Sequence, residues 1–216
     1  VDAADVNKMT PLHFAAQDGH IDVAKVLIQN GADVNAVQIN NATVLHFVSQ
    51  YGHVDVVKVL IQNGADVNAV DQYKRTSLHA PAQNGHADVA TVLLQNGADV
   101  DAVDKDKLTA LHFASRDGRV DVVKLLIREG ADVNAVDNGK STALHYAVLK
   151  GHVDVAKVLI QNGADVNAVD EEKWTPLHFA GGEKYQRPPF WCFDEDLFFH
   201  LVESGDAKGV ERLIYE

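Results

Sequence analysis

The chain has 216 residues, of which 46% are hydrophobic, and its formal net charge is −12 at pH 7. This length can bury a sizeable core, while no apolar run approaches the roughly 20 residues that cross a bilayer. The acidic balance argues against DNA or RNA as a partner, because phosphate binding needs clustered Lys and Arg. The single cysteine, Cys192, cannot form an internal disulfide, which is typical of a reducing compartment. We therefore predict a cytoplasmic protein that neither inserts into a membrane nor binds nucleic acid.

A period of 33 residues organises the chain. One marker, Thr-x-Leu-His, starts at Thr10, Thr43, Thr76, Thr109, Thr142 and Thr175. A second marker, Gly-Ala-Asp-Val, starts at Gly31, Gly64, Gly97, Gly130 and Gly163. A fixed period of this length is typical of proteins in which each unit stacks on its neighbours. Much of the negative charge belongs to the repeat, because aspartates recur at fixed positions of the unit.

The first unit predicts two short helices and a loop. A helix over residues 11–17 begins after Thr10 as the N-cap and stops before Gly19. The run 21–28 is apolar on much of its circumference and ends at Gly31, so we expect the second helix to be the buried one. Residues 34–43 predict an extended, turn-forming loop. Neither helix is long enough to be stable alone, so the units must stack.

The stretches Thr-Pro-Leu-His-Phe-Ala at 10–15 and 175–180 resemble the ankyrin signature, and the period agrees. The resemblance covers about residues 4 to 180. It implies an all-α repeat solenoid of stacked helix-turn-helix units with connecting β-hairpin loops. It also implies a concave face, lined by hairpin tips and first helices, that binds another protein.

The period breaks at Gly181. We predict an ankyrin repeat array over residues 1–180, with five full repeats and the start of a sixth. Residues 181–195 form an irregular insert rich in aromatics and proline, and 196–216 a displaced ankyrin-like helix pair that continues in a longer protein. The aromatics Phe190, Trp191 and Phe193 either cover the open end of the array, form a second contact for a partner, or contact another domain.

The eleven histidines suggest metal binding at first, but the repeat explains them better. One histidine of each unit belongs to the signature and another follows the helix-ending glycine, where the family uses them for hydrogen bonds. Arg119 interrupts the second series, and no cysteine cluster accompanies either. Nucleophile-elbow and phosphate-loop patterns are missing. We therefore expect no enzyme, metal, cofactor or small-molecule substrate.

Asparagines follow Asp-Val in four units, each with a leucine eight residues earlier: Asn35, Asn68, Asn134 and Asn167. One interpretation is turn hydrogen bonding. The resemblance implies another, because asparaginyl hydroxylases accept ankyrin asparagines in this setting.

Positions that vary between units, while the frame stays fixed, are the candidates for partner binding. Apolar, aromatic and arginine side chains at such solvent-facing positions are typical of interfaces, although neutral drift is the alternative for any one of them. The predicted partner-binding residues are Met9, Ile39, Gln50, Tyr51, Gln72, Tyr73, Arg75, Asn84, Lys105, Asp106, Leu108, Arg116, Asp117, Leu149 and Trp174. We place the centre at Tyr51, Tyr73, Arg75, Leu108 and Arg116.

The third unit departs from the others, with Ala80 in place of an aromatic and Pro81 inside its first helix. Because proline removes a helical hydrogen bond, we expect a hinge there. Two functions stay open. One is a protein-binding array, resembling the ankyrin effectors of intracellular bacteria, which would place it in the host cytoplasm. The other is a non-catalytic targeting arm of a larger enzyme or toxin whose catalytic domain lies outside this chain.

Overall fold

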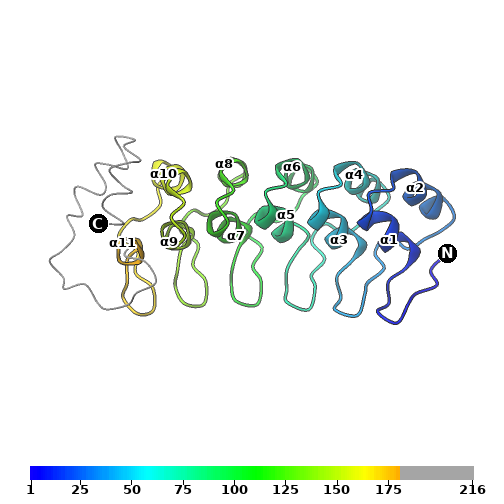
Figure 1. Cartoon of the computed structure of the whole chain (residues 1–216), viewed down its shortest axis with the longest axis horizontal. Helices are drawn as coiled ribbons and strands as arrows, with labels where there is room; N and C mark the ends of the chain where they lie inside the picture. Colours follow the sequence, from blue (N-terminus) through cyan, green and yellow to red (C-terminus); the bar gives the residue numbers. More distant parts are fainter. Residues whose placement is uncertain (181–216) are drawn as a thin grey trace.

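The computed structural model describes residues 1–180, and these form one row of stacked helix pairs (Figure 1). In Figure 1 the first helices of the units lie nearer the loops and the second helices lie away from them. The helices are α1 (Pro11–Gln17), α2 (Ile21–Gln29), α3 (Val44–Tyr51), α4 (Val54–Gln62), α5 (His79–Asn84), α6 (Ala87–Gln95), α7 (Ala110–Arg116), α8 (Val120–Arg128), α9 (Ala143–Leu149), α10 (Val153–Gln161) and α11 (Pro176–Phe179). The all-α repeat solenoid predicted from the period is therefore confirmed. The predicted insert at 181–195 and helix pair at 196–216 lie outside the described residues.

Except for α5, the first helices begin where the sequence predicts, at a threonine N-cap. The Thr43 side chain accepts a hydrogen bond from the His46 backbone N–H, and the Thr43 backbone N–H donates to His46 Nδ1 at 3.2 Å. This reciprocal capping box ties the signature threonine to the signature histidine, which satisfies N–H groups that the helix leaves unpaired. Thr10 caps α1 in the same way, with Pro11 in the first turn.

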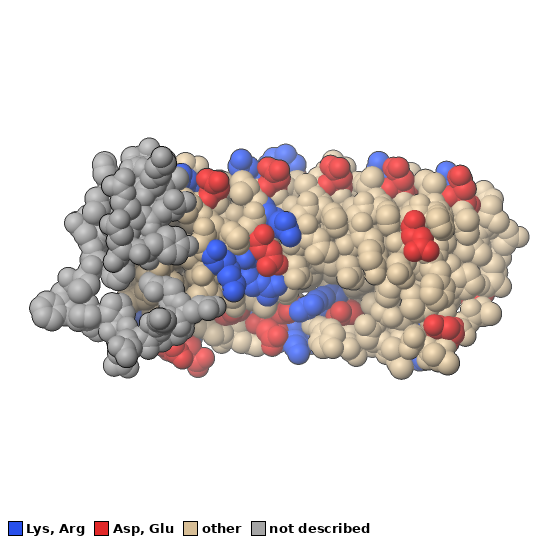
Figure 2. Space-filling view, in the orientation of Figure 1, with Lys and Arg blue, Asp and Glu red and all other residues tan. Residues whose placement is uncertain are grey.

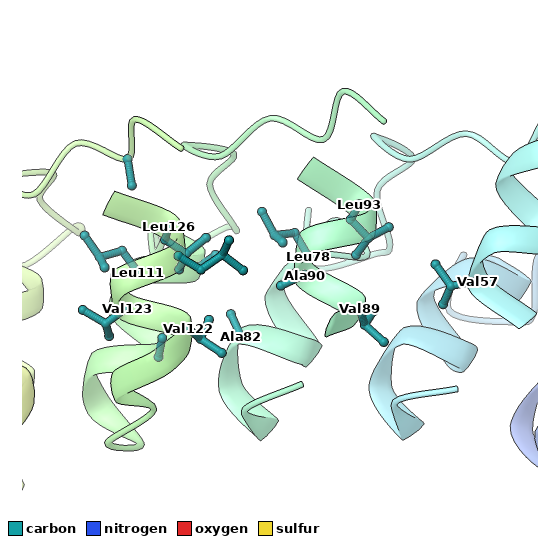
Figure 3. Packing of buried hydrophobic residues seen from close by; sticks show 14 of the residues in the cluster. Val57, Leu78, Ala82, Val89, Ala90, Leu93, Leu111, Val122, Val123 and Leu126 are labelled. Carbon is teal, nitrogen blue, oxygen red and sulfur yellow. The ribbon is translucent and has the colours of Figure 1, made fainter. Parts of the chain in front are cut away.

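The core lies between successive units, as the stacking argument requires. In Figure 3, Leu78, Leu93, Leu111 and Leu126 point into the space between neighbouring helix pairs, and each is at most 1% exposed. No unit buries its apolar face alone. Burial of this continuous layer supplies the main stabilisation of the array.

The expectation that the second helix of the first unit is buried was wrong. In α2 only Ala24 is buried, and Val23 and Val26 are 50% and 57% exposed. Their counterparts in α4, Val56 and Val59, are 1% and 9% exposed because α2 packs beside α4. A valine that faces away from its own unit is thus buried by the preceding unit. The apolar periodicity within one unit does not reveal this burial.

The loops predicted as β-hairpins are tight turns without a sheet in residues 1–180, where only the isolated bridges Val37–Thr43 and Val136–Thr142 form. An aspartate side chain closes most of these turns. Asp104 Oδ1, for example, accepts the backbone N–H groups of Asp106 at 2.8 Å and Leu108 at 3.0 Å, while Lys107 adopts a φ of 61°. The loops are therefore held by side-chain-to-backbone bonds together with backbone bonds across the turn, such as Asp104 N–H to the Leu108 carbonyl at 3.0 Å.

The third unit accommodates its proline by starting its helix late. α7 begins at Ala110, immediately after Thr109, whereas α5 begins at His79, so Pro81 falls in the first turn of a six-residue helix. There the missing N–H is tolerated. Within residues 1–180, no helix combines the length and the apolar character that a membrane span requires.

Candidate partner-binding surface

The predicted partner-binding residues lie on the loops and on the first helices, which together we call the loop face. Successive first helices pack side by side, and the loops hang from them in parallel (Figure 1). Exposed members of the set are Ile39, Gln50, Tyr51, Gln72, Tyr73, Asn84, Lys105 and Asp106. Half-buried members are Met9, Arg75, Leu108, Arg116, Asp117, Leu149 and Trp174. The structure thus carries the whole set on one layer of the array.

Backbone hydrogen bonds fix neighbouring loops to one another. The Lys105 N–H donates to the Tyr73 carbonyl at 2.8 Å, and the Gln72 N–H donates to the Asn40 carbonyl at 2.9 Å. Equivalent bonds join the loops at Ile39 to Asn7, Asn138 to Asp106, and Glu171 to Gly139. A surface built from these loops is therefore linked across the units, so fewer conformations are lost when it binds.

The middle of the loop face holds a cluster of cations and aromatic rings. The Arg75 guanidinium carbon lies 5.7 Å from the Tyr73 ring centroid and 5.1 Å from that of Phe113. Lys105 Nζ lies 5.0 Å from the Tyr73 centroid, and the Arg116 guanidinium carbon lies 4.9 Å from that of Phe113. Each contact is within the range of cation–π attraction. We call Tyr73, Arg75, Lys105, Phe113 and Arg116 the cation–π cluster.

Two carboxylates position the arginines of this cluster. Arg75 Nε lies 3.5 Å from Asp104 Oδ2, an ion-pair contact in which the Asp104 side chain is fully buried and that of Arg75 is 40% exposed. Arg116 Nη2 lies 3.4 Å from Asp117 Oδ2. Because Asp104 Oδ1 is already bound by two backbone N–H groups, the turn that closes the loop also orients Arg75.

Charged residues of both signs occur on both layers of the array. Figure 2 shows Lys and Arg gathered in the middle of the molecule below α7, with some acidic residues among them, and a regular row of acidic residues along the edge at the second helices, with Lys or Arg beside most of them. That regular row agrees with the aspartates in the first turn of each second helix, such as Asp88 and Asp121, where a carboxylate suits the helix dipole.

Two predicted central residues do not join the cation–π cluster. The Tyr51 ring stacks on His53, with centroids 6.4 Å apart, at the end of α3. Leu108 is half-buried, and its carbonyl faces His79 Nε2 at 3.3 Å. Trp174, in the last described unit, packs against its own unit, with its ring centroid 5.6 Å from that of Phe179.

Sequence reasoning missed Phe113 and Asp104, which support the arginines. Phe113 occupies a frame position that is aromatic in most units, and the turn aspartate also recurs, so variation between units gives no signal for either. From the sequence, Ala80 and Pro81 predict only a hinge and give no sign of a cavity.

Four signature histidines connect successive units through hydrogen bonds: His46, His79, His112 and His145. His46 Nδ1 accepts from the Thr43 N–H, so Nε2 carries the proton and donates to the Arg75 carbonyl at 2.9 Å. Burial lowers the pKa of these imidazoles, at His13, His46, His79, His112 and His145. Over residues 1–180, no group of three or more His, Cys, Asp or Glu side chains could hold a metal ion.

The second histidine series bonds in the opposite direction along the array. His53 Nε2 lies 2.9 Å from the Gln17 carbonyl, and His152 Nε2 lies 3.0 Å from that of Arg116. In the fourth unit Arg119 Nε takes the same place, donating to the Gln83 carbonyl at 2.9 Å. The hydrogen-bonding interpretation of the histidines is confirmed, and it explains why arginine can replace one of them.

The asparagines proposed for hydroxylation are exposed, but their side-chain amides bridge units. Asn68 Nδ2 donates to the Gly97 carbonyl and its Oδ1 accepts from the Asp99 N–H, both at 2.9 Å. Asn35 and Asn134 make the equivalent bonds, and the Asn167 backbone N–H donates to Asp165. Turn hydrogen bonding is thus confirmed, and hydroxylation stays a prediction. The aromatics Phe190, Trp191 and Phe193 lie outside the described residues.

Comparisons with known proteins agree with this geometry. A family model described as ankyrin repeats (3 copies) matches residues 30–104, 96–170 and 136–186, and a model described as ankyrin repeat matches residues 7–38. The chain is 57% identical over 37 residues to ankyrin repeat domain-containing protein 49 of Bos taurus and 58% identical over 36 residues to alpha-latrocrustotoxin-Lt1a of Latrodectus tredecimguttatus. Each match covers 17% of this chain, but only 16% and 2% of those proteins. The relatives therefore share the repeat, and since the family models cover most of the sequence, the chain belongs to the ankyrin repeat family.

Proposed function

We propose that the chain is a protein-binding module whose contact surface is centred on the cation–π cluster of the loop face. Ankyrin repeats are generally protein–protein interaction modules, and the matched models describe ankyrin repeats alone. The observation that carries the proposal is the placement of Tyr73, Arg75 and Arg116 together, half-exposed or exposed, on loops that are bonded to one another.

The chemistry of the cluster suits an interface. Tyrosine and arginine are enriched among residues that dominate binding energy, and a side chain already held by neighbours loses less entropy when a partner orders it. Ring contacts and carboxylates hold both arginines here. The cluster presents Arg75, Lys105 and Arg116 within a chain that is otherwise acidic, which favours a partner segment that carries carboxylates and aromatic groups.

Affinity capture from a cell lysate tests this proposal. The array with Tyr73→Ala and Arg75→Ala is compared with the unchanged chain and with a control that carries Lys25→Ala and Lys58→Ala on the second helices, whose ion pairs with Asp22 and Asp55 are exposed. The proposal expects a captured protein that the loop-face variant loses and the control keeps. Equal capture by all three chains would refute it.

The finer functions remain predictions. An effector role in the cytoplasm of a host and the role of a non-catalytic targeting arm are both compatible with a protein-binding array. The match to a toxin covers about one repeat of that protein and carries the repeat alone. The full reading frame distinguishes them, because a catalytic signature beyond these residues favours the targeting arm and further repeats favour the binding array.

A further inference from the structure

A series of ring contacts along the first helices is interrupted at one place. The signature histidine of one unit meets the aromatic residue of the next edge to face in the pairs His13–Phe47, His79–Phe113, His112–Tyr146 and His145–Phe179, with centroids 5.4 to 5.9 Å apart. The partner that this series assigns to His46 is residue 80, which is alanine. His46 therefore lacks the ring that the other four histidines contact.

A cavity of about 290 Å³ lies at this place. Its wall combines the rings of Phe47 and Phe113 and the Ala80 methyl group with polar side chains, among them His46, Gln50 and Gln83. A dry cavity of roughly 150 Å³ is enough to bind benzene. The cavity, which includes the position of the missing side chain, is thus large enough for a phenyl ring, and it is open to solvent.

The electrostatics of the cavity also suit a ring. Arg75 lines it, and the faces of aromatic rings carry negative charge that attracts a guanidinium. The other charged residue of the lining, Asp71, uses Oδ1 to accept the N–H groups of Tyr73 and Arg75 at 2.7 and 2.9 Å, so part of its charge is offset within its own turn. The complementarity favours an aromatic group over an aliphatic one.

We propose that this cavity is a specificity pocket that receives one aromatic side chain of the partner protein, which takes the place of the ring missing at position 80. The inference rests on the proposed function, because it assigns the partner an aromatic anchor beside the cation–π cluster. An inserted ring would lie against His46 and Phe113 and within reach of the Arg75 guanidinium. The same alanine that interrupts the repeat frame thereby creates the site.

The experiment titrates the isotope-labelled chain with N-acetyl-phenylalanine amide and follows the NMR signals of the Ala80 methyl group and the His46 ring. The two comparison probes are N-acetyl-cyclohexylalanine amide, a ring without π electrons, and N-acetyl-alanine amide. We expect saturable binding of the aromatic probe with a dissociation constant on the order of 1 mM, the range for a ligand of this size. The cyclohexyl probe should bind several-fold more weakly, and the alanine probe should not saturate.

Two variants make the result decisive. Ala80→Phe restores the repeat frame and fills the cavity, so its melting temperature should be retained and its affinity for the aromatic probe should fall at least tenfold. Arg75→Gln should abolish the preference for the phenyl over the cyclohexyl ring. Equal binding of all three probes, or unchanged binding by Ala80→Phe, would overturn the pocket.

Capture of the partner by the two sets of variants distinguishes a failure of this inference from a failure of the proposed function. If Ala80→Phe keeps the partner while Tyr73→Ala with Arg75→Ala loses it, the loop face binds but the pocket is not used, and the inference fails alone. If instead the unchanged chain self-associates and Ala80→Phe does not, the occupant is a second copy of this chain, which also contradicts the assignment to a partner protein.

Discussion

Mild acid should unfold the array through its signature histidines. In His13, His46, His79, His112 and His145, burial lowers the pKa of the folded imidazole, whereas the unfolded chain titrates near pH 6.5. Above that pH the imidazoles are neutral in both the folded and the unfolded chain, so their titration does not reduce the free energy of unfolding. As the pH falls below about 6.5, the unfolded state takes up protons first, so the free energy of unfolding decreases until the folded imidazoles are protonated as well.

The magnitude follows from the number of coupled groups. Each histidine can lower the free energy of unfolding by at most about 1.4 kcal/mol per pH unit. Five histidines therefore give an upper limit of about 7 kcal/mol per pH unit. A typical domain has only about 5–15 kcal/mol in total. Protonation of Nδ1 would also remove the acceptor of the threonine N–H, as at Thr109, where that bond is 3.1 Å long.

Urea unfolding followed by circular dichroism at pH 7.5, 6.5 and 5.5 measures this slope. His112→Gln removes one titrating group while keeping a residue that suits the capping box, so its stability should fall less steeply, by up to about 1.4 kcal/mol per pH unit. Leu111→Ala is the matched control, because it weakens the neighbouring core by about 2–5 kcal/mol and should leave the slope unchanged. Parallel slopes for the unchanged chain and His112→Gln would refute the reasoning.

Three further predictions concern the frame of the array. Gly52→Ala should destabilise the folded array by at least about 1 kcal/mol, because the φ of Gly52 is +80° and an added Cβ would lie 2.9 Å from the His86 ring. An unchanged melting temperature in thermal melts would contradict this. Asp101→Asn should raise the free energy of unfolding by about 1 kcal/mol, since the new amide could donate to the next unit as Asn68 does to the Gly97 carbonyl. A loss of stability in urea unfolding would count against that bond. If α5 is a hinge, Pro81→Ala should raise its amide hydrogen-exchange protection to that of α7; equal protection before the substitution would exclude the hinge.

The helices and their caps could be predicted from the sequence because their determinants are local. Thr43 and His46 lie three residues apart, and the 33-residue period shows that the same arrangement recurs. Burial of the second helices could not be predicted in the same way. Val23 and Val56 occupy the same position of the unit, yet only Val56 is covered, because a preceding unit packs against it.

The sequence predicts which residues of the candidate surface differ between units, but not the contacts that they make. Comparison of the units points to Tyr73, Arg75 and Arg116 because these residues differ from their counterparts. It gives no weight to Phe113 or Asp104, whose residue types recur, although their contacts hold the arginines in place. The cavity at Ala80 needed coordinates, because one missing side chain creates space only between particular neighbours in three dimensions.

Amide hydrogen exchange of the array, alone and saturated with its captured partner, measures whether the loop face binds that partner. We predict added protection along the loop face, in the loops at residues 71–75 and 104–108 and in α5 and α7, with the second helices α6 and α8 unchanged. Protection confined to α6 and α8, with those loops unaffected, would contradict it.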